Sequence, residues 1–530
     1  MRITELRLQS FRGIGPEFVL PFDNAGKNLL IYGENGAAKS SLARALELLF
    51  DPQSVSNLLE HQNLFTGRPP QIEITFSGTK SGRDHNESIT WTSAAPKPLP
   101  PWLLSSAARS AFLDHRKLFL LSDRNRDLSE GFFRTAVQNL FAHLDAGRSG
   151  TTVAGLWQQI QRDIVAYQRA QQNPTREAET GVADQVARHT PIENAINQLN
   201  QALDDYLTPL AARPAELVTE AGRLLRYFEG LQLKVQLEFE HLTFNRADGT
   251  TSGGRIHPHI TYCTKDLGVG TGPAWTANHH HVLNEARLTA LALALFFAAV
   301  RLQDRTQYIA GTGPDEPCRL LVLDDLLIGL DYEHRIPVFK IIQEEFVKEK
   351  RYQVVLLTHN RVWFDVCRLQ LDEKDWKIIE IFAKRGLGPD SPDFPVRKQS
   401  ASDLIKRAQE FLNDNEYPAA ANYARTALET ALKSICDKRR APIPFRLDAE
   451  KHSAEAFINA LANIRLHKGG SWHLVPLSTQ KQLKAFRSTV LNPLSHAHPT
   501  TVTPTEIRIA IRIAERLVRI AKNLKIPEDL

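Results

Sequence analysis

The segment that most constrains the fold of this 530-residue chain is a glycine-rich loop near its N-terminus, IYGENGAAKSS at residues 31–41. It fits the pattern G-x-x-x-x-G-K-[ST] except at Ala38, where the second glycine usually stands. The loop follows the apolar run LLIY and precedes an amphipathic segment, which predicts a strand, a loop and a helix in that order. Backbone N–H groups of such a loop and the N-terminus of its helix bind phosphate oxygens. The segment therefore predicts a phosphate-binding site.

The residue types in this loop indicate which side chains contact phosphate and which bind a metal ion. Lys39 is expected to contact the outer phosphates, and the Ser40 hydroxyl is expected to bind Mg²⁺. The methyl group of Ala38 is tolerable where the backbone wraps the phosphate if φ is negative there, and it is expected to weaken binding. The phosphate-binding residues predicted in this segment are Gly33, Asn35, Gly36, Ala37, Ala38, Lys39, Ser40 and Ser41.

Two later apolar runs end in polar residues that complete such a site. RLLVLDDLLIGLD (319–331) and VVLLTHN are rich in Leu and Val without alternation, which is typical of parallel strands covered on both faces. Asp324 is expected to hold Mg²⁺, directly or through water, and Asp325 to act as general base for the attacking water. His359 follows the second strand and is expected to sense the γ-phosphate. Asp325 and His359 are the predicted catalytic residues, and Asp324 joins Ser40 as a predicted metal ligand.

Between residues 129 and 235 the apolar residues take on helical spacing. Two sets recur at intervals of three and four, which predicts two helices that each carry an apolar seam. The sets are Trp157, Ile160, Ile164 and Tyr167, then Ile192, Ile196, Leu199, Leu203 and Tyr206. The two helices either fold back on each other as an antiparallel arm of roughly 30–45 Å or form a helical subdomain packed on the body.

In this order and across this insertion, GENGAAKS, LDDLLIGLD and LLTHN resemble the motifs of ATP-binding cassette (ABC) heads of the SMC and RecF superfamily. The opening LRLQSFRGIG is similar to that family's first strand and Phe-Arg-Gly turn, which implies that Arg12 approaches the nucleotide. The resemblance implies ATP and Mg²⁺ as cofactors. It also implies a homodimer, or a higher homo-oligomer, in which two heads enclose two ATP molecules.

Two further segments match parts of that family that meet in the dimer. VLNEARLTALALAL stands where the family's signature segment precedes a long helix, but Asn284 replaces its serine, and Glu285 and Ala286 replace its glycines. Without glycines, close approach of the backbone to a phosphate is hindered, so the resemblance implies slow hydrolysis. The family's D-loop matches at Gly329–Asp331. Asn284, Glu285 and Asp331 are therefore also predicted to contact nucleotide.

The predicted architecture is an α/β ABC-type ATPase head with a short helical, coiled-coil-like insertion, followed by an all-α C-terminal domain. The segment RGLGPDSPDFPVRKQS is dense in Gly, Pro and Ser, which is typical of a linker. The predicted parts are an N-terminal lobe with the Walker A loop (1–128), the insertion (129–235), a C-terminal lobe with the signature, Walker B strand, D-loop and switch histidine (236–385), the linker (386–400) and the helical domain (401–530).

The C-terminal domain carries a candidate ribonuclease site. NYARTALETALKSICDKRR is expected to form a helix that places Arg425 and Glu429 on one face, and His496 lies in the later segment FRSTVLNPLSHAH. These residues resemble HEPN-type nucleases, with His496 as acid or base and Arg425 on the developing phosphate charge. The eight residues between Arg487 and His496 exceed the spacing of the common HEPN motif. The alternative is an i,i+4 ion pair in a non-catalytic bundle.

Charge is distributed unevenly along the chain. Residues 401–530 contain 20 Lys+Arg against 13 Asp+Glu, a surplus of +7, whereas the whole chain has a net charge of +5. A basic domain can bind nucleic acid or an acidic partner, and its alternative is a set of solvated helix surfaces. The same alternatives apply to the arginines on one face of the last helix, Arg508, Arg512, Arg516 and Arg519.

Composition narrows the protein classes further. Four dispersed cysteines with no CxxC pair argue against a zinc ribbon or a disulfide scaffold and predict a cytoplasmic protein. The longest apolar run, residues 288–300, is shorter than the ~18 residues that a membrane-spanning helix needs, so no membrane association is expected.

The resemblance extends to the stand-alone antiphage ATPases of the Septu, retron-associated and PARIS type. It implies a sensor ATPase that regulates a separate nuclease effector. Two alternatives belong to other classes: a self-contained HEPN-type toxin that cuts tRNA under the control of its ATPase, and a RecF-like DNA-repair clamp.

Overall fold

The computed structural model of the chain describes residues 1–50, 58–80, 83–93, 102–103, 106, 110–114, 133–134, 136–142, 144, 146, 151–172, 182–208, 215–228, 233–263, 265–266, 268–269, 276–277, 283–306, 318–326, 330, 332–348, 352–384, 386, 392–443, 454–462, 464–465, 473–486 and 503–524. The chain divides into two compact units, Met1–Arg397 and Lys398–Leu530.

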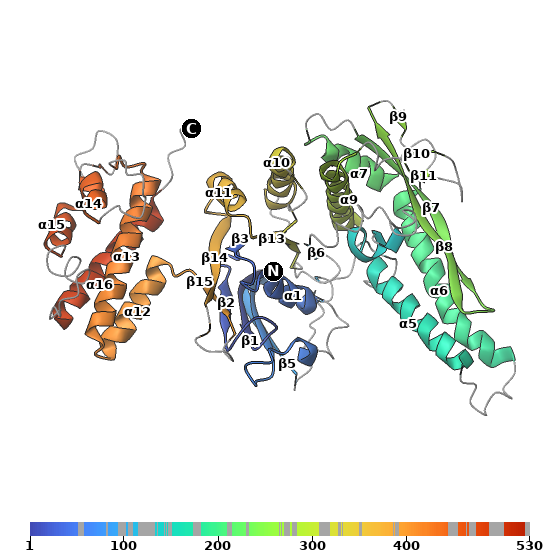
Figure 1. Cartoon of the computed structure of the whole chain (residues 1–530), viewed down its shortest axis with the longest axis horizontal. Helices are drawn as coiled ribbons and strands as arrows, with labels where there is room; N and C mark the ends of the chain where they lie inside the picture. The colour runs from blue at the N-terminus through green and yellow to red at the C-terminus, as the bar shows by residue number, and fades with distance from the viewer. Residues whose placement is uncertain are drawn as a thin grey trace. The chain divides into compact units, whose positions relative to one another are not determined.

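A six-stranded sheet runs through the first unit in the order β15-β14-β3-β13-β12-β6 (Figure 1). Its strands are β3 (Asn28–Gly33), β6 (Ala111–Asp114), β12 (Leu320–Asp324), β13 (Gln353–Thr358), β14 (Trp376–Lys384) and β15 (Phe394–Arg397). All neighbouring strands are parallel except β14 and β15. The two runs expected to form buried parallel strands are β12 and β13, and their parallel pairing confirms that expectation.

Hydrophobic layers cover both faces of this sheet, and every residue of β3, β12 and β13 is buried. Leu29 and Ile31 of β3 belong to one cluster, together with side chains of α1 (Lys39–Phe50). Leu30 belongs to the other cluster, together with side chains of α9 (Glu285–Thr306). Alternate residues thus enter opposite layers, which is why these strands are apolar throughout.

A four-stranded antiparallel sheet lies in the same layer as α1. Its order is β2-β1-β4-β5, and its strands are β1 (Arg2–Gln9), β2 (Phe18–Pro21), β4 (Gln71–Lys80) and β5 (Arg83–Thr92). The buried side chain of Gln353 ties it to β13: its Oε1 accepts from Ile3 N at 2.7 Å, and its Nε2 donates to Ile3 O at 2.8 Å. This contact positions the antiparallel sheet beside the strand that precedes His359.

The predicted insertion contains two long helices, α5 (Val153–Gln172) and α6 (Val182–Leu207), which pack against each other. They lie beside a hairpin of β7 (Leu233–Asn245) and β8 (Thr250–Tyr262), which β9 (Lys265–Asp266) extends (Figure 1). Buried Asn200 of α6 donates to Leu242 O at 2.8 Å and accepts from Leu242 N at 3.0 Å. The apolar seams of α5 and α6 belong to one hydrophobic cluster with α9. The described helices therefore pack on the body of the unit.

The remaining short elements of the first unit connect these layers. They are η2 (Leu58–His61), η3 (Ala136–Leu140), α7 (Glu216–Leu225), β10 (Gly268–Val269), β11 (Thr276–Ala277), α10 (Tyr332–Ile341), η5 (Ile342–Val347) and α11 (Arg361–Gln370).

Part of the predicted linker is a strand. β15 lies within residues 386–400 and pairs with β14 in antiparallel register, Pro395 opposite Ala383. Proline is tolerated there because β15 is an edge strand, where the missing N–H does not interrupt a central ladder. The turn-forming composition that suggested a linker is compatible with an edge strand for this reason.

Five helices are described in the second unit: α12 (Ala401–Asn413), α13 (Tyr417–Lys438), α14 (Ala454–Ala462), α15 (Leu477–Phe486) and α16 (Pro504–Asn523). Helices α12, α13 and α16 contact one another around a hydrophobic cluster. α13 contributes a run of buried alanines, Ala420, Ala424, Ala427 and Ala431, whose small side chains let neighbouring helices approach closely.

In the part of the chain that the structure describes, no helix combines the length and the apolar character needed to cross a bilayer.

Candidate functional site

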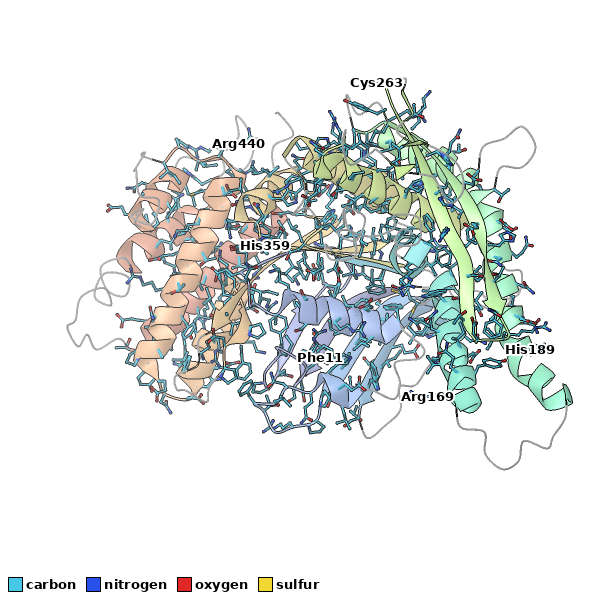
Figure 2. All side chains as sticks on the ribbon, turned by 45° about the vertical axis from the view of Figure 1, so that its right-hand side comes forward. Phe11, Arg169, His189, Cys263, His359 and Arg440 are labelled. Carbon is cyan, nitrogen blue, oxygen red and sulfur yellow. The ribbon has the colours of Figure 1, made fainter. Side chains whose placement is uncertain are left out.

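Three predicted site residues come together at one edge of the six-stranded sheet. β3, β13 and β12 are adjacent parallel strands, so their carboxyl ends meet at the same edge. The phosphate loop follows β3, Asp325 follows β12, and His359, which Figure 2 labels, follows β13. Ligand sites of open parallel sheets lie at this end of the strands.

Lys39 occupies the centre of this arrangement. Its side chain is 6% exposed, and Nζ donates to the carbonyl oxygens of Gly33 at 2.7 Å and Glu34 at 3.2 Å. Nζ also lies 3.7 Å from Asp325 Oδ2. Gly33 leaves room for this side chain, because a Cβ there would stand 3.0 Å from Lys39 Cγ. These contacts hold the ammonium group against the phosphate loop.

Asp325 links the phosphate loop to His359. Its Oδ1 accepts from the backbone N of His359 at 2.8 Å and lies 2.9 Å from His359 Nδ1. The two residues also line a pocket that Arg335 of α10 borders. A carboxylate held by an imidazole and an ammonium group can accept a proton from a water molecule in this pocket. The structure thus brings the two predicted catalytic residues into contact, and their catalytic role stays a prediction.

Asp324 is the residue that best fits a metal ion. It is 5% exposed, and its buried Oδ1 has no hydrogen-bond partner among the described residues. Burial raises the pKa of this carboxyl above its ordinary value, the charges of Asp325 and Asp114 raise it further, and a hydrogen bond with Ser40 and the charge of Lys39 lower it. Because the folded-state pKa is raised, protonation stabilises the fold at low pH, and this stability is lost as the pH rises through the raised pKa. A cation at Oδ1 would offset that cost at neutral pH, so the pair Asp324 and Ser40 fits Mg²⁺.

Asp114 was not found by sequence reasoning. It ends β6 and stands in register with Asp324 on the neighbouring strand. The only signal in the sequence is a short apolar run, AFLD, that ends in a carboxylate. The tertiary structure brings this carboxylate to the same sheet edge, where its charge contributes to the raised pKa of Asp324.

Ala38 has a backbone conformation that is unfavourable for alanine. Its φ is +58°, in the left-handed region, whereas a negative φ was the condition for tolerating alanine at this position. The left-handed conformation brings Cβ too close to the following carbonyl, at a cost of about 1–2 kcal/mol for a residue other than glycine. Gly36, with φ +88°, supplies the other left-handed turn of the loop without this cost.

Ala38→Gly is expected to raise the free energy of unfolding by about 0.5–1 kcal/mol, because relief of the left-handed strain exceeds the added entropy of the unfolded chain. The measurement is the melting temperature of each variant without nucleotide. Ala37→Gly is the matched control: Ala37 is buried and is not among the residues with positive φ, so loss of its methyl group is expected to destabilise by about 0.8 kcal/mol. Equal melting temperatures for Ala38→Gly and the unchanged chain would contradict the strain argument.

The loop that carries Arg12 is anchored next to the phosphate loop. Arg12 N donates to His61 O at 2.7 Å, and Asn63 Nδ2 donates to Arg12 O at 2.6 Å. Gly13 N lies 3.4 Å from Ser41 Oγ, at the start of α1. Arg12 itself is exposed and, like Asp325, has a positive φ. Backbone strain of this kind persists where the surrounding contacts enforce it, and it clusters at functional sites.

The predicted signature residues form a helix start. Asn284 Oδ1 accepts from Arg287 N at 3.0 Å, so Asn284 caps α9, and Glu285 is its first residue. Both are exposed, and α9 packs on α7 and α10. The described interactions therefore do not bring these two residues to the phosphate loop of the same chain. The D-loop residue Asp331 lies outside the described residues.

The candidate ribonuclease residues are only partly described. Arg425 Nε and Glu429 Oε1 lie 3.0 Å apart on α13, as their spacing predicted. His496 and Arg487 lie outside the described residues. The described pair alone is an i,i+4 ion pair, which is the non-catalytic alternative for these residues.

Solved structures of SMC head domains are similar to this chain. An SMC head bound to the C-terminal winged-helix domain of ScpA is 13% identical, with a TM-score of 0.39 over 75% of this chain and 98% of that one. A head with an extended coiled coil, bound to the C-terminal domain of ScpA and derived from Pyrococcus furiosus, is 14% identical, with a TM-score of 0.37 over 78% and 99%. The SMC head from Thermotoga maritima is 14% identical, with a TM-score of 0.32 over 75% and 100%. No protein-family model and no curated protein matches the chain.

Proposed function

We propose that this protein binds ATP with Mg²⁺, hydrolyses it slowly and dimerises in the ATP-bound state. The observation that carries the proposal is the convergence of Lys39, Asp325 and the Asp324–Ser40 pair at the ends of three adjacent parallel strands. A cation, an activating carboxylate and a metal-binding carboxylate are the parts that phosphoryl transfer to water requires. Residues of these three chemical types lie at one edge of the sheet, which supports the proposal.

Each residue has a distinct part in this proposal. Lys39 exchanges its contacts with the carbonyls of Gly33 and Glu34 for oxygens of the outer phosphates. Asp325 accepts the proton of the attacking water, and His359 holds the carboxylate through its backbone N and Nδ1. Mg²⁺ held by Asp324 and Ser40 would neutralise charge on the phosphates. Arg12 and the backbone N–H groups of Asn35, Gly36, Ala38, Lys39 and Ser40 complete the anion-binding surface.

Slow hydrolysis follows from the start of α9. In the proposed dimer, this helix start faces the γ-phosphate of the other copy. The side chain of Asn284 already caps the helix, and Glu285 places a carboxylate in the first turn. A negative charge at a helix N-terminus opposes the binding of an anion there. The γ-phosphate is therefore held less tightly than it is by a glycine-rich segment.

On the motif resemblance, we assign this ATPase to antiphage defence in the cytoplasm, as a sensor that holds or releases a separate nuclease. The ion pair of Arg425 with Glu429 is expected both for this assignment and for a self-contained tRNA-cutting toxin, because both place the two residues on one helix face. A HEPN-like role for the second unit and a RecF-like clamp remain the competing proposals. Ribonuclease activity lost on Arg425→Ala would favour the toxin, and ATP-dependent binding of gapped DNA would favour the clamp.

The test of the proposed function is ATP turnover and molar mass of the purified full-length chain. With Mg²⁺ and ATP, we expect turnover below about 1 s⁻¹, the lower end of ordinary enzymes. We also expect the molar mass from light scattering to double, and both effects to be lost when EDTA replaces Mg²⁺. A chain that neither binds nor hydrolyses ATP would refute the proposal.

A further inference from the structure

The last helix of the chain, α16, has one apolar and one cationic face. Its N-terminus is fixed by a capping box in which the Thr503 side chain and Glu506 exchange hydrogen bonds. The residues of α16 that are buried in the hydrophobic cluster of the second unit are Ile507, Ala510, Ile511, Ile513, Ala514, Leu517 and Ala521. The opposite face is exposed and carries four arginines, the arginine stripe: Arg508, Arg512, Arg516 and Arg519.

The arginine stripe has one described carboxylate on its own face, Glu515. None of its four guanidinium groups forms an ion pair or a hydrogen bond with a described side chain, although Glu515 lies on the same face. The acidic residue Glu506 is engaged in the cap, where its Oε2 accepts from Thr503 N at 2.8 Å. Like charges three and four residues apart destabilise a helix. With four arginines against one glutamate, this face carries a surplus of positive charge.

Other helical arginines of the same unit differ in this respect. Arg407 lies 3.0 Å from Glu410, and Arg425 lies 3.0 Å from Glu429, each within one turn of its own helix. In these pairs the sequence places a carboxylate where it neutralises the arginine. On α16 the positions four residues after Arg508 and Arg512 hold further arginines, and Glu515, three residues after Arg512, forms no ion pair with a residue that the structure describes. This contrast distinguishes the stripe from an ordinary solvated face.

We propose that the arginine stripe binds the phosphate backbone of a nucleic acid. Successive arginines at four-residue spacing stand about 6 Å apart along the axis, and the stripe extends about 17 Å, which is enough to contact several consecutive phosphates. An acidic protein is the other polyanion to consider. Protein interfaces bury an apolar core, but every exposed residue described on α16 is polar. The stripe is therefore better suited to bind the regularly spaced phosphates of a nucleic acid than the surface of an acidic protein.

The proposal does not depend on ATP binding, because all the residues that carry it lie in the second unit. The test uses the full-length chain without nucleotide and measures binding to a 30-nucleotide single-stranded DNA, the RNA of the same sequence and the corresponding DNA duplex. Fluorescence anisotropy between 50 and 200 mM KCl gives the dependence of affinity on salt. Four phosphate contacts predict a slope of about −2.8 for single strands and about −3.6 for duplex DNA. The three probes also separate RNA from DNA and single strands from duplex.

The double variant Arg512→Gln, Arg516→Gln removes two of the four charges. It is expected to make the slope shallower by about 1.4 for single strands or about 1.8 for the duplex, with an affinity at least tenfold lower at 100 mM KCl. Arg512→Lys, Arg516→Lys keeps the charges and is expected to leave the slope unchanged. Arg407→Gln is the matched control, because it removes an exposed arginine that Glu410 already neutralises.

Two results would overturn the proposal. The first is equal affinity and slope for the unchanged chain and the double glutamine variant, which would place nucleic-acid binding elsewhere. The second is absence of binding to all three probes at 50 mM KCl, which would leave an acidic protein as the partner of the stripe. Circular dichroism and the lysine variant exclude loss of folding as the cause. ATP binding measured in parallel shows whether the nucleotide site fails independently.

Discussion

Lys39→Ala is expected to raise the Kd for ATP at least about 100-fold, equivalent to about 2.7 kcal/mol of binding free energy. The ammonium group is 6% exposed and already held over the phosphate loop by two carbonyl oxygens. A charge in such a sheltered position interacts with a phosphate more strongly than one in water. Isothermal titration of ATP in the presence of Mg²⁺ measures the loss.

The control for this variant must separate binding from folding. Lys39→Ala also removes the ionic partner of Asp325, so the melting temperature is recorded for each protein. Lys27→Ala is the matched substitution: Lys27 pairs with Asp23 at 3.3 Å on the same unit and directly precedes β3, whereas the phosphate loop follows the other end of that strand. It should leave ATP affinity unchanged. A folded Lys39→Ala variant that binds ATP within about threefold of the unchanged chain would contradict the assignment of the phosphate site.

Asp325→Asn is expected to lower the turnover of ATP at least about 100-fold, which is the usual contribution of a general base. Asparagine keeps the shape of the side chain but cannot take a proton from water. It also tolerates the positive φ of +53° at this position, so the fold is expected to survive. Affinity for ATP should change by less than about threefold, because Lys39 and Asp324 remain.

The same variant tests the ATP-bound state. When hydrolysis is blocked, ATP should hold the dimer, and its fraction in light scattering should exceed that of the unchanged chain. A pull-down with the trapped dimer then searches for the effector. Asp365→Asn, a substitution of an exposed carboxylate on α11 that pairs with Arg361 at 3.0 Å, is the control. Turnover that falls less than tenfold in Asp325→Asn would remove Asp325 as the base, and a trapped form that stays monomeric and captures no other chain would refute the sensor role.

Local sequence patterns predicted the parts of the site that depend on neighbouring residues. The run LLIY followed by a glycine-rich loop and a helix became β3, the phosphate loop and α1, because each element is encoded within about ten residues. The continuous apolar runs before Asp324 and His359 became buried parallel strands, because burial on both faces removes the need for polar alternation. The sequence therefore predicted that Asp324 and Asp325 stand at the end of one buried strand and that His359 follows another.

Other features depend on contacts that the sequence does not encode locally. The left-handed backbone of Ala38 is imposed by the loop and the start of α1, and no composition rule indicated it. Asp114 reaches Asp324 only because β6 pairs with β12, more than 200 residues later in the chain. Asn284 resembles a signature residue by position, but the helix that follows uses its side chain as a cap.

The sequence alone determined which residue types follow each buried strand and that the chain has a basic helical C-terminal region. Only the tertiary structure decided how these residues meet. Strand order places β13 between β3 and β12, which brings His359 within 2.9 Å of Asp325 and Lys39 within 3.7 Å of the same carboxylate. The reason is physical: hydrophobic periodicity specifies the faces of an element, whereas the choice of neighbouring strand depends on the packing of whole layers.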